Sequence, residues 1–111
     1  MESGRDVVVV LVTTPAGAAS EVAQAIVRHK LAACVNIASG VQSIFWWQGE
    51  VQEEAEALLV AKTTSDLVQP LNDLLAAIHP YENFELIAIP VVAGSAAYLE
   101  WVAASSGPAA P

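Results

Sequence analysis

Apolar residues form four stretches that either alternate with polar residues or run without interruption, and such stretches predict strands. Val7 to Thr13 is a continuous run rich in β-branched residues, which is typical of a buried central strand. Leu31 to Trp47 is extended, with apolar and polar positions alternating from Val35 onward. Glu50 to Thr63 and Glu85 to Val92 complete the set. We therefore expect four strands.

The two central strands are unusually long and are joined by Gln48-Gly49, which indicates a tight hairpin turn. Gly40 lies midway along the first of them and indicates a bend or bulge. These strands are far longer than the usual strand of about five or six residues. Their outer half would present an unpaired edge unless another subunit covers it.

Helical spacing of apolar residues predicts two helices between the strands and one after them. The clearest runs from Ser65 to Ile78, and Ser20 to Lys30 predicts another, with acidic Glu21 near its start and basic residues at its end, as suits the helix dipole. A short final helix is predicted from Gly94 to about Ala104.

The order of these elements predicts the fold class. Strand, helix, strand, strand, helix, strand is the βαββαβ order of a ferredoxin-like α+β sandwich, with both helices on one face of an antiparallel sheet. We expect one such domain over residues 7–104, including an extra C-terminal helix. Residues 1–6 are predicted to be a flexible lead and residues 105–111 a flexible tail.

The composition favours self-association. Hydrophobic residues make up 55% of the 111 residues and charged residues only 14%, whereas a typical domain carries about 25% charged residues. So few charges leave much of the surface of a small domain apolar, and contiguous apolar surface marks an interaction site. A symmetric homo-oligomer is the simplest way to cover it.

Charge and cysteine usage exclude some partners. The net charge of −8 comes with only four basic residues, which form no patch, so we expect no nucleic-acid partner. The longest aliphatic run, Val7 to Val12, is too short for a membrane span or a secretion signal. Cys34 is the single cysteine, so no intrachain disulfide is possible, which fits a reducing compartment. Together, the short apolar run and the single cysteine lead us to expect a cytoplasmic protein with no membrane partner.

Five strings, in order and at the right spacing, resemble one family. They are KLAACVNI (Lys30 to Ile37), WWQGEV (Trp46 to Val51), AKTT (Ala61 to Thr64), HPYENFELIAIPV (His79 to Val91) and YLEWV (Tyr98 to Val102). Together they resemble the CutA divalent-cation tolerance family over nearly the whole chain. The resemblance implies a ferredoxin-like subunit in a homotrimer whose long hairpins pair across subunits, similar in plan to the PII signalling proteins. It also implies a link to tolerance of copper and other divalent metals, with no established reaction.

The resemblance further implies a copper site. The ligands proposed in some relatives are a cysteine at the end of the first strand and two adjacent histidines before a Pro-Tyr pair. Here Val12 and Ile78 occupy two of these positions, and only His79 remains. Because imidazole suits Cu²⁺, we predict His79 as the candidate ligand of this or another divalent metal. The alternative is that its ring caps or packs the end of a helix.

A second candidate site is a ligand-binding pocket beside His79, made of Lys62, Tyr81, Glu82 and Glu85. Lys62 ends an apolar stretch where a charge is unexpected, and Tyr81 and Glu82 belong to a polar and aromatic loop after a helix, a common place for binding. The alternative is an ion pair of Lys62 with Glu82 or Glu85 that fixes a subunit interface.

Aromatic residues near the hairpin tip are predicted to form the interface. Phe45, Trp46 and Trp47 belong to this group, and the two tryptophans should point to opposite faces, one packing within the subunit and one across the interface. The acidic residues that follow are expected to face solvent, with weak binding of a hard cation as the alternative. They are Glu50, Glu53, Glu54 and Glu56.

The sequence contains no nucleophile–base pair, phosphate-binding glycine loop or metal-ligand spacing, so we expect no enzyme. The leading hypothesis is a homotrimer that binds or responds to divalent metal ions such as copper. The alternatives are a PII-like regulator that binds a small organic ligand in clefts between subunits, and an interaction scaffold.

Overall fold

The β-branched run near the start of the chain forms the central strand of a sheet. In the computed structural model, which describes residues 5–108, this strand is β1 (Val7–Pro15), and it pairs antiparallel with β3 on one side and β4 on the other. Alternate side chains from Val8 to Thr14 are buried, and those between them are half-buried. One face of β1 therefore lies in the core and the other does not.

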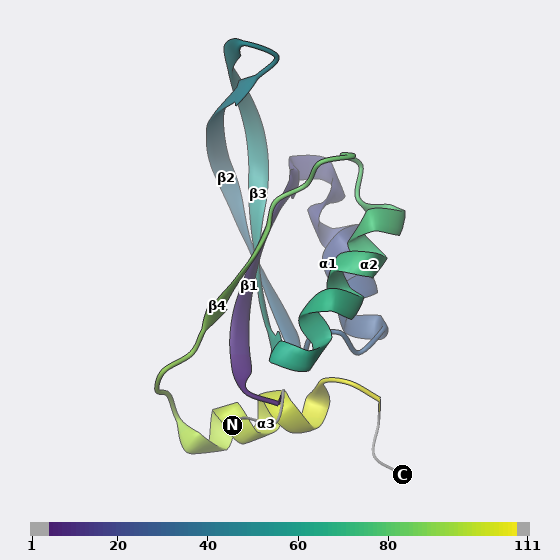
Figure 1. The fold of residues 1–111 in the computed structure, drawn as a ribbon, viewed down its shortest axis with the longest axis vertical. Coiled ribbons are helices and arrows are strands. Elements are labelled where there is room, and N and C mark those ends of the chain that lie inside the picture. Colours follow the sequence, from purple (N-terminus) through teal and green to yellow (C-terminus); the bar gives the residue numbers. More distant parts are fainter. Residues whose placement is uncertain (1–4, 109–111) are drawn as a thin grey trace.

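Four strands make one antiparallel sheet in the order β2-β3-β1-β4. β2 (Cys34–Trp47) and β3 (Glu50–Thr64) form the long hairpin, and β4 (Leu86–Pro90) is a short edge strand beside β1 (Figure 1). This order, with a helix after β1 and another after β3, confirms the predicted ferredoxin-like arrangement.

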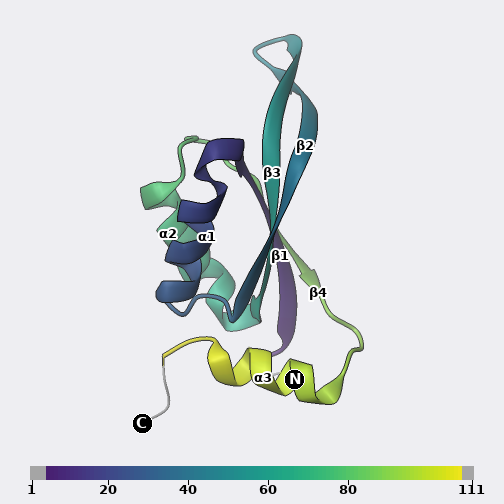
Figure 2. The ribbon, with the colours of Figure 1, turned by 180° about the vertical axis from the view of Figure 1, so that it is seen from behind.

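Two helices cover one face of the sheet, as predicted. α1 (Ala19–Arg28) follows the short 3₁₀ turn η1 (Ala16–Ala18), and α2 (Val68–Ile78) follows η2 (Ser65–Leu67). Figures 1 and 2 show both helices on the same side of the strands. The core lies between the two layers, and its largest fully buried apolar side chains include Val10, Val12, Ile26, Leu59, Leu71 and Leu75.

The hairpin projects beyond the helices (Figure 1) and gives the described chain extents of 47 × 26 × 23 Å. Its ladder shifts register between Ala38 and Val41, where Gly40 has a φ of 77°. At the tip, Gln48 and Gly49 have φ values of 51° and 80°, and two successive left-handed residues make the turn that matches the twist of a hairpin. The predicted bulge and turn are both confirmed.

A third helix, α3 (Ala96–Ser105), lies across the end of the sheet opposite the hairpin tip (Figures 1 and 2). The Ser95 side chain caps its first turn by accepting a hydrogen bond from the Tyr98 N–H at 3.5 Å. Val102 is fully buried, and the Ser106 hydroxyl donates to its carbonyl at 2.7 Å. The C-terminal helix is therefore fixed to the domain.

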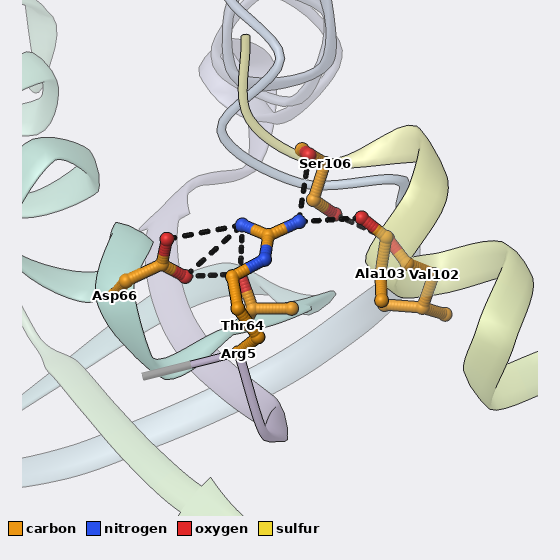
Figure 3. Close-up of polar contacts among 6 residues, drawn as sticks. All are labelled: Arg5, Thr64, Asp66, Val102, Ala103 and Ser106. Carbon is orange, nitrogen blue, oxygen red and sulfur yellow. Dashed lines mark hydrogen bonds and ion pairs between the residues drawn. The ribbon is translucent and has the colours of Figure 1, made fainter. Parts of the chain in front are cut away.

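Arg5 joins the start of the chain to the end of α3 (Figure 3). One guanidinium nitrogen donates to the Thr64 hydroxyl at 3.1 Å and to the Asp66 carboxylate at 3.0 Å. The other donates to the carbonyl oxygens of Ala103 at 2.6 Å and Ser106 at 3.2 Å. A cation at the C-terminus of a helix interacts favourably with the free carbonyl groups there.

Asp66 is the acidic partner in this clamp. Burial alone would raise the pKa of Asp66, but the hydrogen bonds from Thr64 and Arg5, together with the positive charge of Arg5, outweigh it and lower the pKa below its ordinary value of 3.8. The carboxylate therefore stays ionised and paired under ordinary conditions.

Residues at both ends of the domain contact distant parts of the chain, and the predicted flexibility of the lead and tail remains a prediction. Besides the Arg5 contacts, the Asp6 carbonyl accepts a hydrogen bond from the Ser65 N–H at 2.8 Å. At the other end, Ser106 is buried, and the Gly107 N–H donates to the Lys30 carbonyl at 2.6 Å. Short-range sequence pattern could not show these contacts between distant residues. The remaining predicted flexible residues, 1–4 and 109–111, lie outside the described residues.

Candidate functional site

His79 ends α2 and begins the loop to β4, and its ring is buried. Ring atom Nε2 lies 2.8 Å from the Thr13 carbonyl oxygen, and Nδ1 lies 3.0 Å from the Tyr81 backbone nitrogen. Because a carbonyl only accepts and a backbone N–H only donates, the ring is neutral with its proton on Nε2. A metal ion would have to displace one of these two bonds. The structure thus favours the packing role of His79, and metal ligation by it remains a prediction.

The His79 ring also organises the loop around it. The Phe84 ring stacks on it with centroids 5.1 Å apart and planes 23° apart, and the Tyr81 ring lies 5.2 Å away at a tilt of 47°. Aromatic pairs at these separations favour a fixed geometry. These ring contacts hold residues 79–84 in a defined conformation, and the loop forms one wall of the groove described next.

An open groove of about 890 Å³ lies between this wall and the projecting half of the hairpin. Its aromatic lining residues are Phe45, Trp46, Trp47, Tyr81 and Phe84. Its acidic lining residues are Glu54, Glu56, Glu82 and Glu85. No Lys or Arg is among its lining residues. The groove therefore presents a negative potential between apolar walls.

Glu56 is the buried carboxylate of this groove, with only 6% of its surface exposed. It lies where β1 ends, opposite Pro15 on β1 and Val41 on β2. Burial raises the pKa of Tyr81 above its ordinary value of 10.0, and a hydrogen bond to the Glu56 side chain and the charges of Glu56 and Glu54 raise it further. The Tyr81 hydroxyl is thus kept as a donor to the carboxylate.

The burial of Glu56 corrects the prediction that the whole acidic run faces solvent. Glu50, Glu53 and Glu54 are exposed as predicted, and Gln42 donates to Glu53 at 2.9 Å across the hairpin. Glu56 differs because the loop after α2 covers its position, which the spacing of acidic residues along the strand does not reveal.

The structure brings three of the four predicted pocket residues together and places the fourth elsewhere. Tyr81, Glu82 and Glu85 line the groove. Lys62 lies on the same strand as Glu56 but roughly 20 Å further along it, opposite Cys34 and Val9. Within the chain, the predicted cluster is therefore split.

Lys62 also has different partners from those predicted. Its ammonium group donates to the Asn36 side-chain oxygen and, at 3.5 Å, to the Val60 carbonyl. The only ion pair between side chains that we identify in residues 5–108 joins Arg5 and Asp66. The alternative interpretation, an ion pair with Glu82 or Glu85, is therefore not formed within the described chain.

The aromatic residues near the hairpin tip are exposed. Trp46 lies opposite Val51 and Trp47 opposite Glu50, so the tryptophans do point to opposite faces. Their exposed fractions are 74% and 51%, and Phe45 is also exposed. Both tryptophans line the groove together with residues of the loop after α2, and the prediction that one packs within the subunit and the other across the interface remains a prediction. The interface role of these residues remains a prediction.

The sheet face opposite the helices carries a second apolar surface. Ile87 and Ile89 on β4, opposite Leu11 and Val9 on β1, have exposed fractions of 50% and 43%. Neither α1 nor α2 covers this face (Figure 2).

Near one end of β2 lies Cys34, which is free and half-buried. Burial and the neighbouring Cys34 side chain raise the pKa of Tyr98 above 10.0, which places this residue of α3 beside the thiol. Cys34 thus packs against α3.

Metal ligands do not converge in the part of the chain that the structure describes. No group of three or more His, Cys, Asp or Glu side chains is placed there to hold a metal ion. His29, the other histidine, has Nδ1 at 2.8 Å from the Ala25 carbonyl at the end of α1, so its ring caps that helix.

Comparison with known proteins decides the family. The family model described as CutA1 divalent ion tolerance protein matches residues 8–105. The chain belongs to the CutA1 family. Among curated CutA relatives, the divalent-cation tolerance protein CutA of Thermus thermophilus is 44% identical over 100 residues, which cover 89% of this chain and 97% of the relative.

Eukaryotic CutA relatives are longer. The chloroplastic protein CutA of Arabidopsis thaliana and the human protein CutA are each 46% identical, over 86% and 76% of this chain. The chain spans about half the length of both, 53% and 47%. Their full-length functions are therefore not carried over to it.

Solved CutA1 structures share the fold. The crystal structure of CutA1 from Oryza sativa and the structure of the Thermus thermophilus protein each have a TM-score of 0.88 and 43% identity, and each covers 91% of this chain. The match covers 94% and 99% of those chains. The predicted family and fold are both confirmed.

The names of CutA1 relatives refer to tolerance of divalent cations and to no enzymatic reaction. They also refer to different compartments. One relative is named chloroplastic, and a solved structure with 31% identity and a TM-score of 0.85 is that of a periplasmic protein from Archaeoglobus fulgidus. In residues 5–108, the helices are too short or too polar to cross a membrane. Family membership thus leaves the compartment of this chain open.

Proposed function

We propose that this CutA1-family chain is a non-enzymatic, cytoplasmic homotrimer that binds or responds to divalent metal ions, copper among them. The observation that carries the metal role is the groove beside His79, which gathers four glutamates with no Lys or Arg among its lining residues. Carboxylates gathered between low-dielectric walls attract cations and raise their local concentration.

The composition of the site favours weak rather than tight metal binding. Val12 and Ile78 offer no ligand atoms, and the single imidazole of His79 is already hydrogen-bonded through both nitrogens. Copper would gain Nδ1 only by displacing the Tyr81 N–H, and its remaining ligands would come from groove carboxylates. One nitrogen with oxygen ligands suits copper less well than several imidazoles.

The homotrimer is supported by the apolar surface that one chain leaves uncovered. The open sheet face presents Ile87 and Ile89, and the hairpin presents Ile44, Trp46 and Val51, all more than 40% exposed. β2 and β4 also form the two edges of the sheet, and an unpaired edge is a template for pairing with another chain. Association would cover both kinds of surface at once.

The test is a calorimetric titration of Cu²⁺ and Zn²⁺ into the purified oligomer. We expect His79→Ala to weaken copper binding at least about tenfold, or roughly 1.4 kcal/mol. His29→Ala is the matched control, since it removes the other histidine of the chain, and it should leave the affinity unchanged. Absence of saturable binding would contradict the metal role, and equal affinity in the His79→Ala protein would remove His79 from it.

A further inference from the structure

We propose that Lys62 of one subunit forms an ion pair with Glu85 of the partner subunit, so that each interface brings together two charges that a single chain keeps apart. The proposal rests on the proposed homotrimer and does not depend on the metal role. It names one contact between two copies of this chain, and each copy contributes one of the two side chains.

Lys62 is a cation on the apolar face of the sheet that the helices leave uncovered. It lies opposite Val9 on β1, which in turn lies opposite Ile89 on β4, and directly opposite residues share one face of a sheet. Lys62 is half-buried, and no carboxylate of residues 5–108 forms an ion pair with it. A subunit that covers this face would bury the charge, and a buried charge without a partner is strongly destabilising.

The ammonium group of Lys62 is held toward the β2 edge of the sheet. It donates to the Asn36 side-chain oxygen and, at 3.5 Å, to the Val60 carbonyl oxygen. Asn36 belongs to the edge strand β2 and lies opposite Val60, two positions nearer the hairpin tip than Lys62. Neither acceptor carries a charge, so within residues 5–108 the ammonium group has hydrogen bonds but no counter-ion.

Glu85 lies at the other edge of the same face. It directly precedes β4, and the residues on either side of it, Phe84 and Leu86, pack against the core. Glu85 is exposed, as are Ile87 and Ile89, so the alternation places these three side chains on the uncovered face. No Lys or Arg of residues 5–108 forms an ion pair with Glu85. The two edges of this face therefore carry complementary charges.

A cyclic assembly brings these two edges together. In a ring, each interface joins two different surfaces of neighbouring copies. When the ring axis runs along the strands, β2 of one subunit meets β4 of its neighbour. The two strands are antiparallel there, because β2 runs parallel to β1 and β4 runs antiparallel to it. Each interface then closes both free edges of the sheet.

The two charges lie at similar heights in such a ring, because rotation about its axis leaves height unchanged. The two acceptors of the Lys62 ammonium group lie at the level of Leu11 on β1. Glu85 lies one position before the β4 residue that pairs with Val12, and therefore at the level of Thr13. The levels differ by two residues, or roughly 7 Å along the strands. A glutamate side chain and one charge-assisted hydrogen bond can span that distance.

The test reverses the two charges separately and together. Lys62→Glu and Glu85→Lys should each weaken the assembly at least about tenfold, because each places like charges at the interface. The double variant Lys62→Glu/Glu85→Lys should recover most of that loss, since it restores an opposite pair with the positions exchanged. Sedimentation velocity over a dilution series measures the dissociation midpoints, with urea added until the wild-type midpoint comes into range.

Two control variants carry the same charge changes elsewhere. Lys30→Glu alters the only other lysine of the chain, which follows α1. Glu82→Lys alters a carboxylate of the same loop, three positions before Glu85 and outside the line of β4. Each should change the midpoint by less than about twofold.

A chemical cross-link tests the contact without dissociating the assembly. A carbodiimide couples an amine to a carboxylate that it touches. It should join wild-type subunits covalently, and mass spectrometry should identify the bond between Lys62 and Glu85. It should not produce this bond in the Lys62→Met protein, whose side chain keeps its apolar stem.

Three outcomes would overturn the proposal. The first is a double variant that is as weak as the two single losses combined. The second is single variants that are no weaker than the controls, and the third is a cross-link from Lys62 to a different carboxylate. A trimer with any of these results would overturn the pair alone, whereas a monomeric wild type would remove the homotrimer as well. The copper titration of the His79→Ala protein tests the metal role separately.

Discussion

Strand β3 passes through two different environments. From Ala57 to Thr64 it lies between β1 and β2 under the helices, and Leu59, Ala61 and Thr63 have no exposed surface. From Glu50 to Ala55 it pairs with β2 alone, and Val51 is 60% exposed. The backbone pairing with β2 continues through both halves, so the halves differ only in what the rest of the chain packs against them.

The rest of the chain buries one half of the hairpin and leaves the apolar side chains of the other half exposed. Ile44 and Trp46 lie opposite Glu53 and Val51 on one face of the projecting half, and their exposed fractions are 67% and 74%. An isolated two-stranded hairpin is at best marginally stable in water. The covered half is packed by the rest of the chain, and we expect the projecting half to gain stability from a second subunit.

The largest expected effect comes from the covered half. Leu59→Ala removes a fully buried side chain, and we expect it to lower the free energy of unfolding by about 2–5 kcal/mol. Val51→Ala on the projecting half of the same strand is the control, with an expected loss below about 1 kcal/mol for the dissociated chain. Urea unfolding at low protein concentration measures both, and equal losses would contradict the division into two halves.

The next effect should appear in association rather than in folding. Trp46→Ala shortens the most exposed aromatic side chain of the hairpin, and we expect it to weaken subunit association by about 2 kcal/mol or more, as for an aromatic interface anchor. Sedimentation velocity over a dilution series reports the change. Trp101→Ala on α3 is the control. An unchanged dissociation profile in the Trp46→Ala protein would place the interface elsewhere.

A smaller effect is expected at the base of the covered half. Arg5→Met removes the hydrogen bonds to Thr64, Asp66 and the end of α3, and we expect a loss of about 1–2 kcal/mol. Because the pKa of Asp66 is lowered in the fold, its contribution is present above pH 3.8 and is lost as the pH falls below that value. Thermal unfolding should therefore show the gap between wild type and Arg5→Met narrowing in acid. A gap that stays constant with pH would show that the ion pair is not its source.

The smallest effect concerns the hairpin tip. Gln48 has a φ of 51°, which costs less for asparagine than for glutamine. We expect Gln48→Asn to raise stability by a few tenths of a kcal/mol, and Gln42→Asn, at an ordinary strand position, to give no gain. Chemical unfolding of the two variants side by side is the measurement. A loss in Gln48→Asn would contradict the assigned turn.

The fold could be predicted from the sequence because its signals are local. Gly40 predicts a bulge, and Gln48-Gly49 predicts a turn, because of the backbone preferences of these residues. In β1 and in the C-terminal half of β3, side chains alternate between buried and less buried positions along the strand. The anchoring of Arg5 could not be predicted, because it joins residues about a hundred positions apart.

The candidate site was only partly predictable for the same reason. The string from His79 to Glu85 identifies the loop. The neighbouring sequence does not show that the loop packs beside Glu56 of β3 rather than beside Lys62. Nor does it show that both nitrogens of His79 are hydrogen-bonded. Both facts depend on where α2 ends relative to β1, which is a property of the packed domain.

The most direct test of this account is the mass of the wild-type particle by sedimentation equilibrium. The exposed half of the hairpin and the uncovered sheet face predict a stable assembly, and the proposed homotrimer would have about three times the chain mass of 11.6 kDa, unchanged on dilution to micromolar concentration. A particle of 11.6 kDa under the same conditions would mean that the projecting hairpin is stable without a partner, and it would contradict the account.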